Sequence, residues 1–368
     1  MGKDKIRLAV IFGGRSGEHE ISVISARSML DAVAEDRYEV IPIYITSDGR
    51  WFHWEGFATG GPPPDDTFTS YLPVADPTTG AFLRSAGGEH ELQVDVVFPL
   101  LHGPYGEDGT VQGLLEMAGV PYVGSGVLGC SLAMDKAMSK TVMRAEGVPT
   151  VDFVTLDRET YENDGAKIVE RIESAVGYPI FVKPANLGSS IGITKVHKRD
   201  ELGPALGDAF TYDSKAICEQ GIAGRELECS VLGNLEPEAA EVGELRPTRE
   251  FYDYAAKYVT EDTQIVIPAP IPRQTRERVR ELAVKAFVVH DCRGLARVDF
   301  FYLEDKDIVL VNELNTMPGF TPISMYPKLW DATGLNYSSL IDKLVDLAFE
   351  NFEDRKRNQI KYSAAVKI

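Results

Sequence analysis

The chain has 368 residues, of which 44% are hydrophobic and 26% are charged, a composition typical of folded globular proteins. Its length exceeds what one hydrophobic core ordinarily organises, so we expect two or three domains. The formal net charge of −18 at pH 7 argues against a nucleic-acid partner, because binding a phosphate backbone requires a basic face, whereas a nucleotide needs only a local basic pocket.

Cysteine usage and the first apolar run exclude further classes of protein. The four cysteines are widely scattered and form no CxxC pair, which predicts reduced core thiols in a cytoplasmic protein rather than a disulfide framework or a zinc site. The apolar run at 6–12 is too short for a signal peptide or a membrane span, so no membrane partner is expected.

The first elements along the chain are typical of a Rossmann-like domain. The apolar run at 6–12 predicts a buried parallel strand, followed by a glycine-rich break, a helix over about 18–34 and a strand over 40–45. The glycines do not fit GxGxxG and no acidic residue ends the second strand, so a dinucleotide site is poorly supported. Glu18, at the start of the helix, either complements the helix dipole or faces a ligand above the loop.

The rest of this first domain contains one candidate for chemistry. Residues 51–93, which include a Gly-Gly-Pro-Pro-Pro run, predict an irregular excursion. Residues 94–101 predict a buried strand, and His102 follows it at the start of a glycine-rich loop. A lone histidine is usually structural, but α/β sheets bind ligands at the carboxyl ends of strands, so both roles are about equally supported. Gly124-Ser125-Gly126 indicates a domain boundary.

Residues 131–146 predict one continuous helix, because a glycine and a proline follow in the order usual at a helix end. Lys136 and Lys140 are four residues apart on this helix and therefore share a face. On the helix pattern alone, two lysines at this spacing indicate a solvated stripe.

A lysine inside an apolar strand marks the next segment. Lys183 lies within the predicted strand 180–184, and the Gly/Ser-rich loop 186–192 leads into a second strand at 193–196. A Walker A loop runs from strand to helix and ends in GK[ST], which this loop does not. The loop is either a plain hairpin turn or, as its run of small residues favours, a flap whose backbone amides and hydroxyls cover a triphosphate.

Two strand-like runs at 295–315 predict a hairpin with a polar face. A turn centred on Lys306 pairs residue 303 with 309 and 301 with 311, and places four polar residues on one face, Asp299 opposite Glu313 and Arg297 opposite Asn315. The other face would hold Ala296, Val298, Phe300, Tyr302, Ile308, Leu310 and Leu314. Carboxylates and a carboxamide suit Mg²⁺ held jointly with substrate phosphates, although a single charged residue is more often part of a solvated face.

Taken together, these segments resemble the ATP-grasp ligases and, among them, the D-alanine–D-alanine ligase family. The matching stretches are GGRSGEHEIS (13–22), HGPYGEDGTVQG (102–113), MDKAMSK (134–140), KPANLGSSIG (183–192), EFYDYAAKY (250–258), ARVDF (296–300) and NELNTMPGFTPISMYP (312–327). They follow the family order over nearly the whole chain. One departure is Asn186-Leu187, which replaces a more polar pair.

The resemblance implies an α/β (α+β) protein with the three-domain ATP-grasp architecture. A Rossmann-like N-terminal substrate domain would span 1–125, and a central ATP-grasp domain with the Gly/Ser flap would span 126–219. A C-terminal ATP-grasp domain with the magnesium and oxyanion sites would span 220–368. The long aromatic segment 243–270 would act as a lid, as long loops in compact domains often do.

The resemblance also implies roles for individual residues. Those contacting ATP would be Lys136 and Lys183 at the phosphates, Glu219 and Ile222 at adenine, Glu226 at the ribose, Lys257 at the γ-phosphate, and Ser190 and Phe301. Asp299, Glu313 and Asn315 would bind two Mg²⁺ (or Mn²⁺) ions, with Glu313 bridging them. Arg297 and the Gly319 amide would form the oxyanion site. The D-alanine subsites would contain Glu18 with Ser189 and Tyr258, Ser324 and His102.

The implied activity is ATP-dependent ligation of two D-alanines through a D-alanyl phosphate, for peptidoglycan precursors of the cell wall, by a cytoplasmic homodimer. Two alternatives stay open: a ligase for another substrate, such as a D-alanine–D-lactate ligase, and a non-catalytic nucleotide-binding protein. All four polar residues of the hairpin are present, which weighs against a non-catalytic protein: Arg297, Asp299, Glu313 and Asn315. Tyr258 stands where ester-forming relatives have a His-bearing loop, and it lacks the positive charge that would repel an ammonium, which favours D-alanine.

Overall fold

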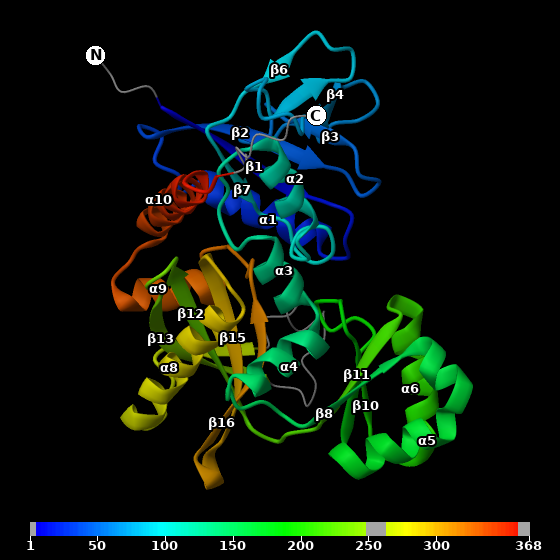
Figure 1. Ribbon diagram of the computed structural model, residues 1–368. Helices are drawn as coiled ribbons and strands as arrows, with labels where there is room; N and C mark the ends of the chain where they lie inside the picture. Colours follow the sequence, from blue (N-terminus) through cyan, green and yellow to red (C-terminus); the bar gives the residue numbers. More distant parts are fainter. Residues whose placement is uncertain (1–4, 248–262, 360–368) are drawn as a thin grey trace, which may run out of the picture.

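The computed structural model describes residues 5–247 and 263–359. These residues form three β-sheets with helices packed on them, which confirms the mixed α/β class. Figure 1 shows the N-terminal sheet at one end of the molecule and the other two sheets side by side at the opposite end, with α3 and α4 between them.

The N-terminal sheet has seven strands in the order β6-β5-β4-β3-β2-β1-β7. Its elements are β1 (Ile6–Gly13), α1 (His19–Leu30), β2 (Tyr38–Ile45), β3 (Trp51–His53), β4 (Ser70–Pro73), β5 (Leu83–Ser85), β6 (Glu91–Leu92), β7 (Val96–Pro99) and α2 (Thr110–Ala118). β1 pairs in parallel with β2 and β7, as a Rossmann-like start requires. The expectation of an irregular excursion at 51–93 is wrong, because β3 to β6 extend the sheet in antiparallel fashion.

The central sheet has four antiparallel strands in the order β10-β9-β11-β8. Its elements are β8 (Phe153–Asp157), α5 (Arg158–Val176), β9 (Ile180–Pro184), β10 (Thr194–Val196), α6 (Arg199–Tyr212) and β11 (Lys215–Gln220). α5 and α6 enclose a core that is separate from the rest of the molecule. β9 and β10 pair directly, so the loop 186–192 joins two strands of a hairpin, as expected.

The C-terminal sheet has five strands in the order β14-β13-β12-β15-β16. Its elements are β12 (Arg225–Gly233), β13 (Glu238–Pro247), β14 (Thr263–Val266), α8 (Arg273–Val289), β15 (Gly294–Leu303), the 3-10 turn η1 (Glu304–Lys306), β16 (Ile308–Asn315), α9 (Met325–Thr333) and α10 (Tyr337–Lys356). α8 covers one face of the sheet, and α9 covers part of the other.

The N-terminal and C-terminal sheets share one hydrophobic core. Buried residues of β1 and β7, such as Val10 and Phe98, pack in one cluster with residues of α9 and α10, such as Trp330 and Leu344. Figure 1 shows α10 lying against the N-terminal sheet. Because the central sheet has its own core, its attachment to the rest of the molecule depends on fewer buried apolar contacts.

The predicted helix 131–146 is divided into α3 (Val127–Met134) and α4 (Lys136–Ala145). Asp135 between them has an extended conformation, and its side chain accepts hydrogen bonds from the backbone N–H groups of Ala137 and Met138. An aspartate in this position is a favourable N-cap, so it ends one helix and starts the next. The expectation of one continuous helix is therefore wrong.

The hairpin of β15 and β16 contains a β-bulge that the expected register lacked. Arg297 pairs with Asn315 and Asp299 with Glu313, as predicted, but Phe300 then pairs with Val311, which leaves Asn312 as the extra residue. One inserted residue turns the following side chains to the opposite face. Val309 and Val311 are therefore buried against α8 in place of Ile308 and Leu310.

The cysteines and the helices bear on the expectations of reduced thiols and of no membrane span. Cys130, Cys218, Cys229 and Cys292 are all free and buried, as predicted. Within residues 5–247 and 263–359, none of the helices combines the length and the apolar character needed to cross a bilayer.

Candidate active site

The face of the C-terminal sheet opposite α8 presents an array of polar side chains on adjacent strands. Glu228 of β12 pairs with Asp299 of β15, which pairs with Glu313 of β16. The Arg297 guanidinium donates to both carboxylate oxygens of Asp299, from Nε and from Nη2, each at 2.7 Å, and its Nε lies 3.1 Å from Oε2 of Glu228. The sheet register therefore brings two carboxylates, Glu228 and Asp299, to one arginine, with Glu313 on the next strand.

Asn315 completes this array. Its Nδ2 donates to Oδ2 of Asp299 at 3.0 Å, so the predicted metal ligands Asp299 and Asn315 are in contact, with Glu313 beside Asp299. No group of three or more His, Cys, Asp or Glu side chains among the described residues is arranged to hold a metal ion. The residues nevertheless fit a hard divalent cation by their chemistry, because Mg²⁺ is usually bound by one or two carboxylates together with substrate phosphates.

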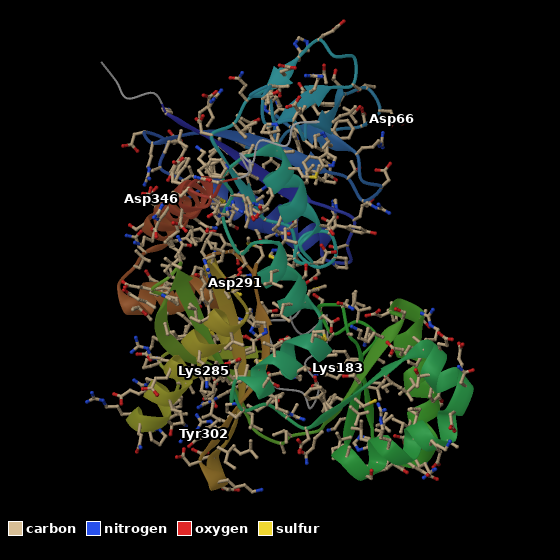
Figure 2. The ribbon with its side chains drawn as sticks, in the orientation of Figure 1. Asp66, Lys183, Lys285, Asp291, Tyr302 and Asp346 are labelled. Carbon is tan, nitrogen blue, oxygen red and sulfur yellow. The ribbon has the colours of Figure 1, made fainter. Side chains whose placement is uncertain are left out.

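Three lysines face this array from α4 and the central sheet. Lys183 of β9 donates to Oε2 of Glu219 at 2.7 Å, and the Lys140 ammonium lies 3.4 Å from Oε1 of the same carboxylate. The Lys136 ammonium lies 4.0 Å from Oε2 of Glu313 on β16. Lys183 is buried beside α4 (Figure 2). A basic cluster next to acidic and amide side chains is suited to a polyphosphate and its counterions.

Burial and mutual attraction change the pKa values in this cluster. Burial lowers the pKa of Lys140 overall, although Glu219 opposes that effect. Burial also disfavours the charged form of Lys183, but Glu219 and Glu313 outweigh it and raise the pKa. For Glu219, burial favours the neutral acid, but Lys140 and Lys183 outweigh it and lower the pKa. Glu219 is therefore ionised inside the protein, because two lysines surround it.

The loop 186–192 closes over the N-terminal domain. The Ser189 hydroxyl donates to Oε1 of Glu18, and both side chains are buried. Ser189 and Ser190 both have left-handed backbone conformations, with φ of 51° and 59°. Two successive non-glycine residues in this conformation store strain, which is common where a backbone must point its N–H groups at a ligand.

The approach of this loop to Glu18 depends on a glycine. A Cβ on Gly188 would lie 3.0 Å from Oε2 of Glu18. The Lys136 ammonium also donates to the backbone oxygen of Leu187 at 2.6 Å, so the lysine predicted to bind phosphate contacts the flap. Glu18, Lys136 and Ser189 therefore bring the N-terminal domain, α4 and the central sheet together at one place.

His102 connects the N-terminal domain to the loop after β16. Its Nδ1 lies 3.0 Å from the backbone oxygen of Met317, which is two residues before the predicted oxyanion residue Gly319. Burial disfavours the charged imidazolium, but Glu107 and then Glu18 outweigh it and raise the pKa of His102. His102 is therefore a buried link between the N-terminal domain and the C-terminal site.

The segment that follows β16 places Ser324 beside Gly319. The Ser324 hydroxyl lies 2.8 Å from the Thr321 hydroxyl and accepts from the Thr321 backbone N–H at 3.1 Å. A Cβ on Gly319 would lie 3.1 Å from the Ser324 oxygen, so the two predicted site residues are adjacent. Ser324 precedes α9, where the helix N-terminus favours a carboxylate.

Of the remaining residues predicted to contact the substrates, three lie in the described part of the chain and two do not. Glu226 pairs with Phe301, so both lie on the polar face of the C-terminal sheet. Ile222 lies in the connection between β11 and β12, near Glu219. Lys257 and Tyr258 lie outside the described residues.

Several residues of this site were not predicted from the sequence. Glu228 has no distinguishing motif, Glu107 lies in the matching stretch 102–113 but was given no role, and Lys140 was interpreted as part of a solvated stripe. Helical periodicity contains a signal for Lys140, because it follows Ala137 by three residues and precedes Met143 by three, and both of these are buried.

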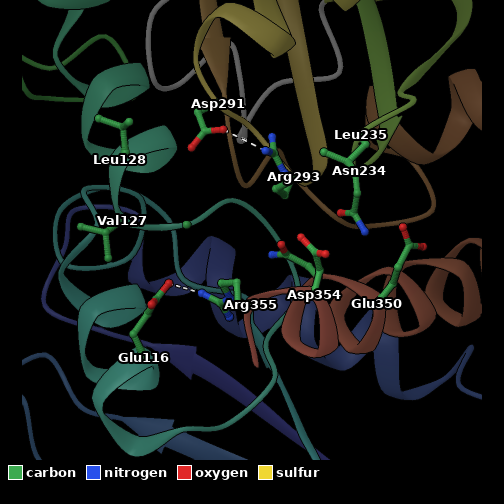
Figure 3. A pocket seen from close by; sticks show the side chains of 12 residues that line it. Glu116, Val127, Leu128, Asn234, Leu235, Asp291, Arg293, Glu350, Asp354 and Arg355 are labelled. Carbon is green, nitrogen blue, oxygen red and sulfur yellow. Dashed lines mark hydrogen bonds and ion pairs between the residues drawn. The ribbon is translucent and has the colours of Figure 1, made fainter. Parts of the chain in front are cut away.

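A separate cavity of about 470 Å³ lies away from these residues. Figure 3 shows it between α2, α3, α10 and the loop that contains Arg293. Its two arginines are engaged with carboxylates, Arg293 with Asp291 at 2.9 Å and Arg355 with Glu116. None of the predicted ATP, metal or D-alanine contacts lines this cavity.

Comparison with known proteins agrees with the geometry. The family model for the D-ala D-ala ligase N-terminus matches residues 7–125, and the model for the C-terminus matches residues 142–346. A D-alanine–D-alanine ligase of Natranaerobius thermophilus is 47% identical over 363 residues, which cover 98% of this chain and 99% of that protein.

Solved structures give the same result. The D-alanine-D-alanine ligase from Coxiella burnetii superimposes with a TM-score of 0.83 at 34% identity, covering 96% of this chain and 97% of that one. VanG D-Ala:D-Ser ligase from Enterococcus faecalis superimposes with a TM-score of 0.84 at 35% identity, covering 94% of this chain and 100% of that one. The predicted ATP-grasp fold is thereby confirmed. The chain belongs to the D-alanine–D-alanine ligase family.

Proposed function

We propose that this chain joins two D-alanines into D-alanyl-D-alanine, with conversion of ATP to ADP and phosphate, for peptidoglycan precursor synthesis. The observation that supports this most directly is the approach of the Lys136 ammonium to Glu313 of the C-terminal sheet, together with the buried Lys183–Glu219 ion pair of the central sheet. The family to which the chain belongs consists of ATP-dependent ligases. An alternative product containing D-serine or D-lactate differs only in the second substrate.

The chemistry requires that a carboxylate be activated. A carboxylate reacts poorly with an amine because its leaving group would be oxide. Transfer of the γ-phosphoryl group of ATP to a carboxylate oxygen of the first D-alanine gives an acyl phosphate and ADP. The amine of the second D-alanine, after losing a proton, then attacks the carbonyl carbon, and phosphate leaves with that oxygen. Lys136, Lys183 and Lys257 would stabilise charge on the phosphates.

The metal ligands in this proposal are Asp299, Glu313 and Asn315, with Glu313 shared by two Mg²⁺ or Mn²⁺ ions. Bound Mg²⁺ would supply neutralisation of the charge on the phosphoryl oxygens. In the described structure Asp299 is neutralised by Arg297 instead. Arg297 would stabilise the tetrahedral oxyanion together with the Gly319 amide when it is not engaged with Asp299.

The two D-alanine subsites follow from the residues around this face. Glu18 would bind the ammonium group of the first D-alanine, and Ser189 and Tyr258 would hold Glu18 and the flap in position. Ser324 would bind the carboxylate of the second D-alanine at the start of α9. His102 would lie near the first substrate, where burial opposes its charged form but Glu107 and Glu18 outweigh that effect and raise its pKa.

ATP would occupy the space between the central and C-terminal sheets, with Glu219 and Ile222 at adenine, Glu226 at the ribose, and Ser190 and Phe301 as further contacts. The domain limits proposed with this arrangement are 1–125, 126–219 and 220–368. The protein is proposed to act as a homodimer in the cytoplasm.

The test is an assay of the purified protein with ATP, Mg²⁺ and a panel of D-alanine, D-serine and D-lactate, with products identified by mass. At neutral pH we expect D-alanyl-D-alanine as the main product, including in an equimolar competition of D-alanine with D-lactate. A predominant ester would contradict the argument from Tyr258 and support a depsipeptide ligase. Consumption of ATP without any ligated product would contradict the proposal as a whole.

A further inference from the structure

Lys140 is buried more completely than a lysine on a solvated helix face would be, with 1% of its surface exposed. A buried ammonium is costly unless it has charged or hydrogen-bonding partners. Its Nζ donates to the backbone oxygen of Asn312 and lies 3.4 Å from Oε1 of Glu219. One lysine on α4 therefore contacts both the central sheet and the β-bulge of the C-terminal sheet.

The two oxygens of Glu219 are divided between two lysines. Oε2 accepts from Lys183 at 2.7 Å, and Oε1, which has no hydrogen-bond partner among the described residues, faces Lys140. The Glu219 residue is 2% exposed. An ionised carboxylate at this depth depends on nearby positive charge, because burial alone favours the neutral acid.

The two lysines differ in what else they can bind. Lys183 is proposed to contact ATP phosphates, and any hydrogen bond it makes to a phosphate weakens its hold on Glu219. Lys140 is enclosed by protein and is held by Asn312, so it remains with Glu219 when nucleotide binds.

Glu219 must be ionised to recognise adenine. The hydrogen-bond donor that adenine presents at its edge is the exocyclic amine, whereas a 6-oxo base such as hypoxanthine has an acceptor at that position. An ionised carboxylate only accepts, so it pairs with the amine and disfavours the 6-oxo group. A neutral carboxyl group can donate or accept and therefore discriminates less.

We propose that Lys140 is a positioning residue that keeps Glu219 ionised and oriented toward the exocyclic amine of adenine, and thereby contributes to the preference for adenine over 6-oxopurine nucleotides. This inference rests on the proposed contact between Glu219 and adenine. It assigns a role to a lysine that itself touches neither phosphate nor base.

The experiment measures the Kd of ADP and of IDP with Mg²⁺ by isothermal titration calorimetry, for the unaltered protein and four variants. Lys140→Gln removes the charge but keeps a donor for Asn312, and Lys140→Met removes both. Glu219→Gln tests the contact with the base itself. Lys285→Met, on the exposed side of α8, is the matched surface control. Thermal unfolding checks that each variant is folded.

We expect Lys140→Gln to lower the IDP-to-ADP Kd ratio by about tenfold or more, the scale of one hydrogen bond to a charged group. Glu219→Gln should lower the ratio similarly, and Lys285→Met should leave it unchanged. An unchanged ratio in both folded Lys140 variants, with loss in Glu219→Gln, would overturn the role of Lys140. An unchanged ratio in Glu219→Gln would overturn the adenine contact on which it rests, while ligation by the unaltered protein would leave the proposed reaction standing.

Discussion

The C-terminal sheet and the 186–192 loop present polar side chains to the same site in different ways. In the sheet, Arg297, Asp299 and Glu313 are fixed by strand pairing, with a buried residue on the opposite face at nearly every alternate position. In the loop, Ser189 and Ser190 have left-handed conformations, and individual side-chain contacts hold it, among them the hydrogen bonds from Ser189 to Glu18 and from Lys136 to Leu187.

We call the strand-paired residues Arg297, Asp299 and Glu313 the fixed surface, and the loop 186–192 the adjustable cover. A strand in the middle of a sheet cannot move one residue without breaking its ladder and exposing its apolar face. A strained loop held by a few side chains can open at much smaller cost. The residues proposed to hold the metal ions therefore lie on the rigid element, and the loop proposed to cover the nucleotide is the element that opens more easily.

The largest expected effect comes from the fixed surface. Glu313→Gln should lower ligation by at least about 100-fold while the protein stays folded, because a neutral amide cannot replace a carboxylate shared by two cations. Steady-state kinetics at saturating Mg²⁺, with thermal unfolding as a check, measures this. Glu304→Gln, on the exposed turn of the same hairpin, is the control. Near-normal activity of Glu313→Gln would contradict the proposed bridging role.

Removing a charge from the central sheet should have an intermediate effect. Lys183→Met should raise the Kd of ATP by about 10- to 100-fold, the scale of one hydrogen bond to a charged phosphate. Lys167→Met, on the exposed surface of α5, should leave the Kd unchanged. An unchanged Kd of ATP in Lys183→Met would show that the lysine neutralises Glu219 and does not bind the phosphates.

The sequence predicted which polar residues share one face of the hairpin, but it did not predict the β-bulge between its strands. The predicted register was wrong beside the turn, where Leu303 pairs with Ile308 and Phe301 with Leu310. It was right for Asp299 with Glu313 and for Arg297 with Asn315, because the extra residue Asn312 compensates for the misplaced turn. The bulge at Asn312 was missed because an extra residue in a strand has no distinctive composition. Its effect was to exchange Leu310 for Val311 in the core.

Other misses have similar physical causes. The break at Asp135 lacks glycine and proline, so only the N-cap preference of aspartate marks it. The strands β3 to β6 have two to four residues each, too few to show periodicity. Helix spacing places Lys140 on the same face as buried residues, but it does not show that a carboxylate from another sheet approaches it.

The adjustable cover should respond to ligands more than the fixed surface does. Binding of ADP, Mg²⁺ and a non-reactive D-alanine analogue should slow amide hydrogen exchange across 186–192 as backbone amides gain phosphate partners. Exchange across β15, already protected by its ladder, should change much less. Mass-spectrometric hydrogen exchange with and without ligand compares them directly. Equal exchange of 186–192 in both states would count against a flap.

The smallest expected effect concerns the junction on which Lys136 and Lys140 are placed. Asp135→Ala should lower the free energy of unfolding by about 1–2 kcal/mol through loss of the helix cap. Asp135→Asn, which can still cap α4 but loses the charge that faces Lys215 at 2.6 Å, should be milder. Chemical denaturation measures both. Equal stability of all three proteins would show that the helix break does not depend on the cap.

The proposed reaction proceeds through an acyl phosphate, in which a carboxylate oxygen of the first D-alanine carries the phosphoryl group from ATP. Ligation of D-alanine labelled with ¹⁸O in its carboxylate group tests it, because the oxygen that receives the phosphoryl group must leave with the phosphate. Mass analysis of the phosphate should find one ¹⁸O atom in each phosphate released from fully labelled substrate. Formation of the dipeptide with unlabelled phosphate would contradict the mechanism.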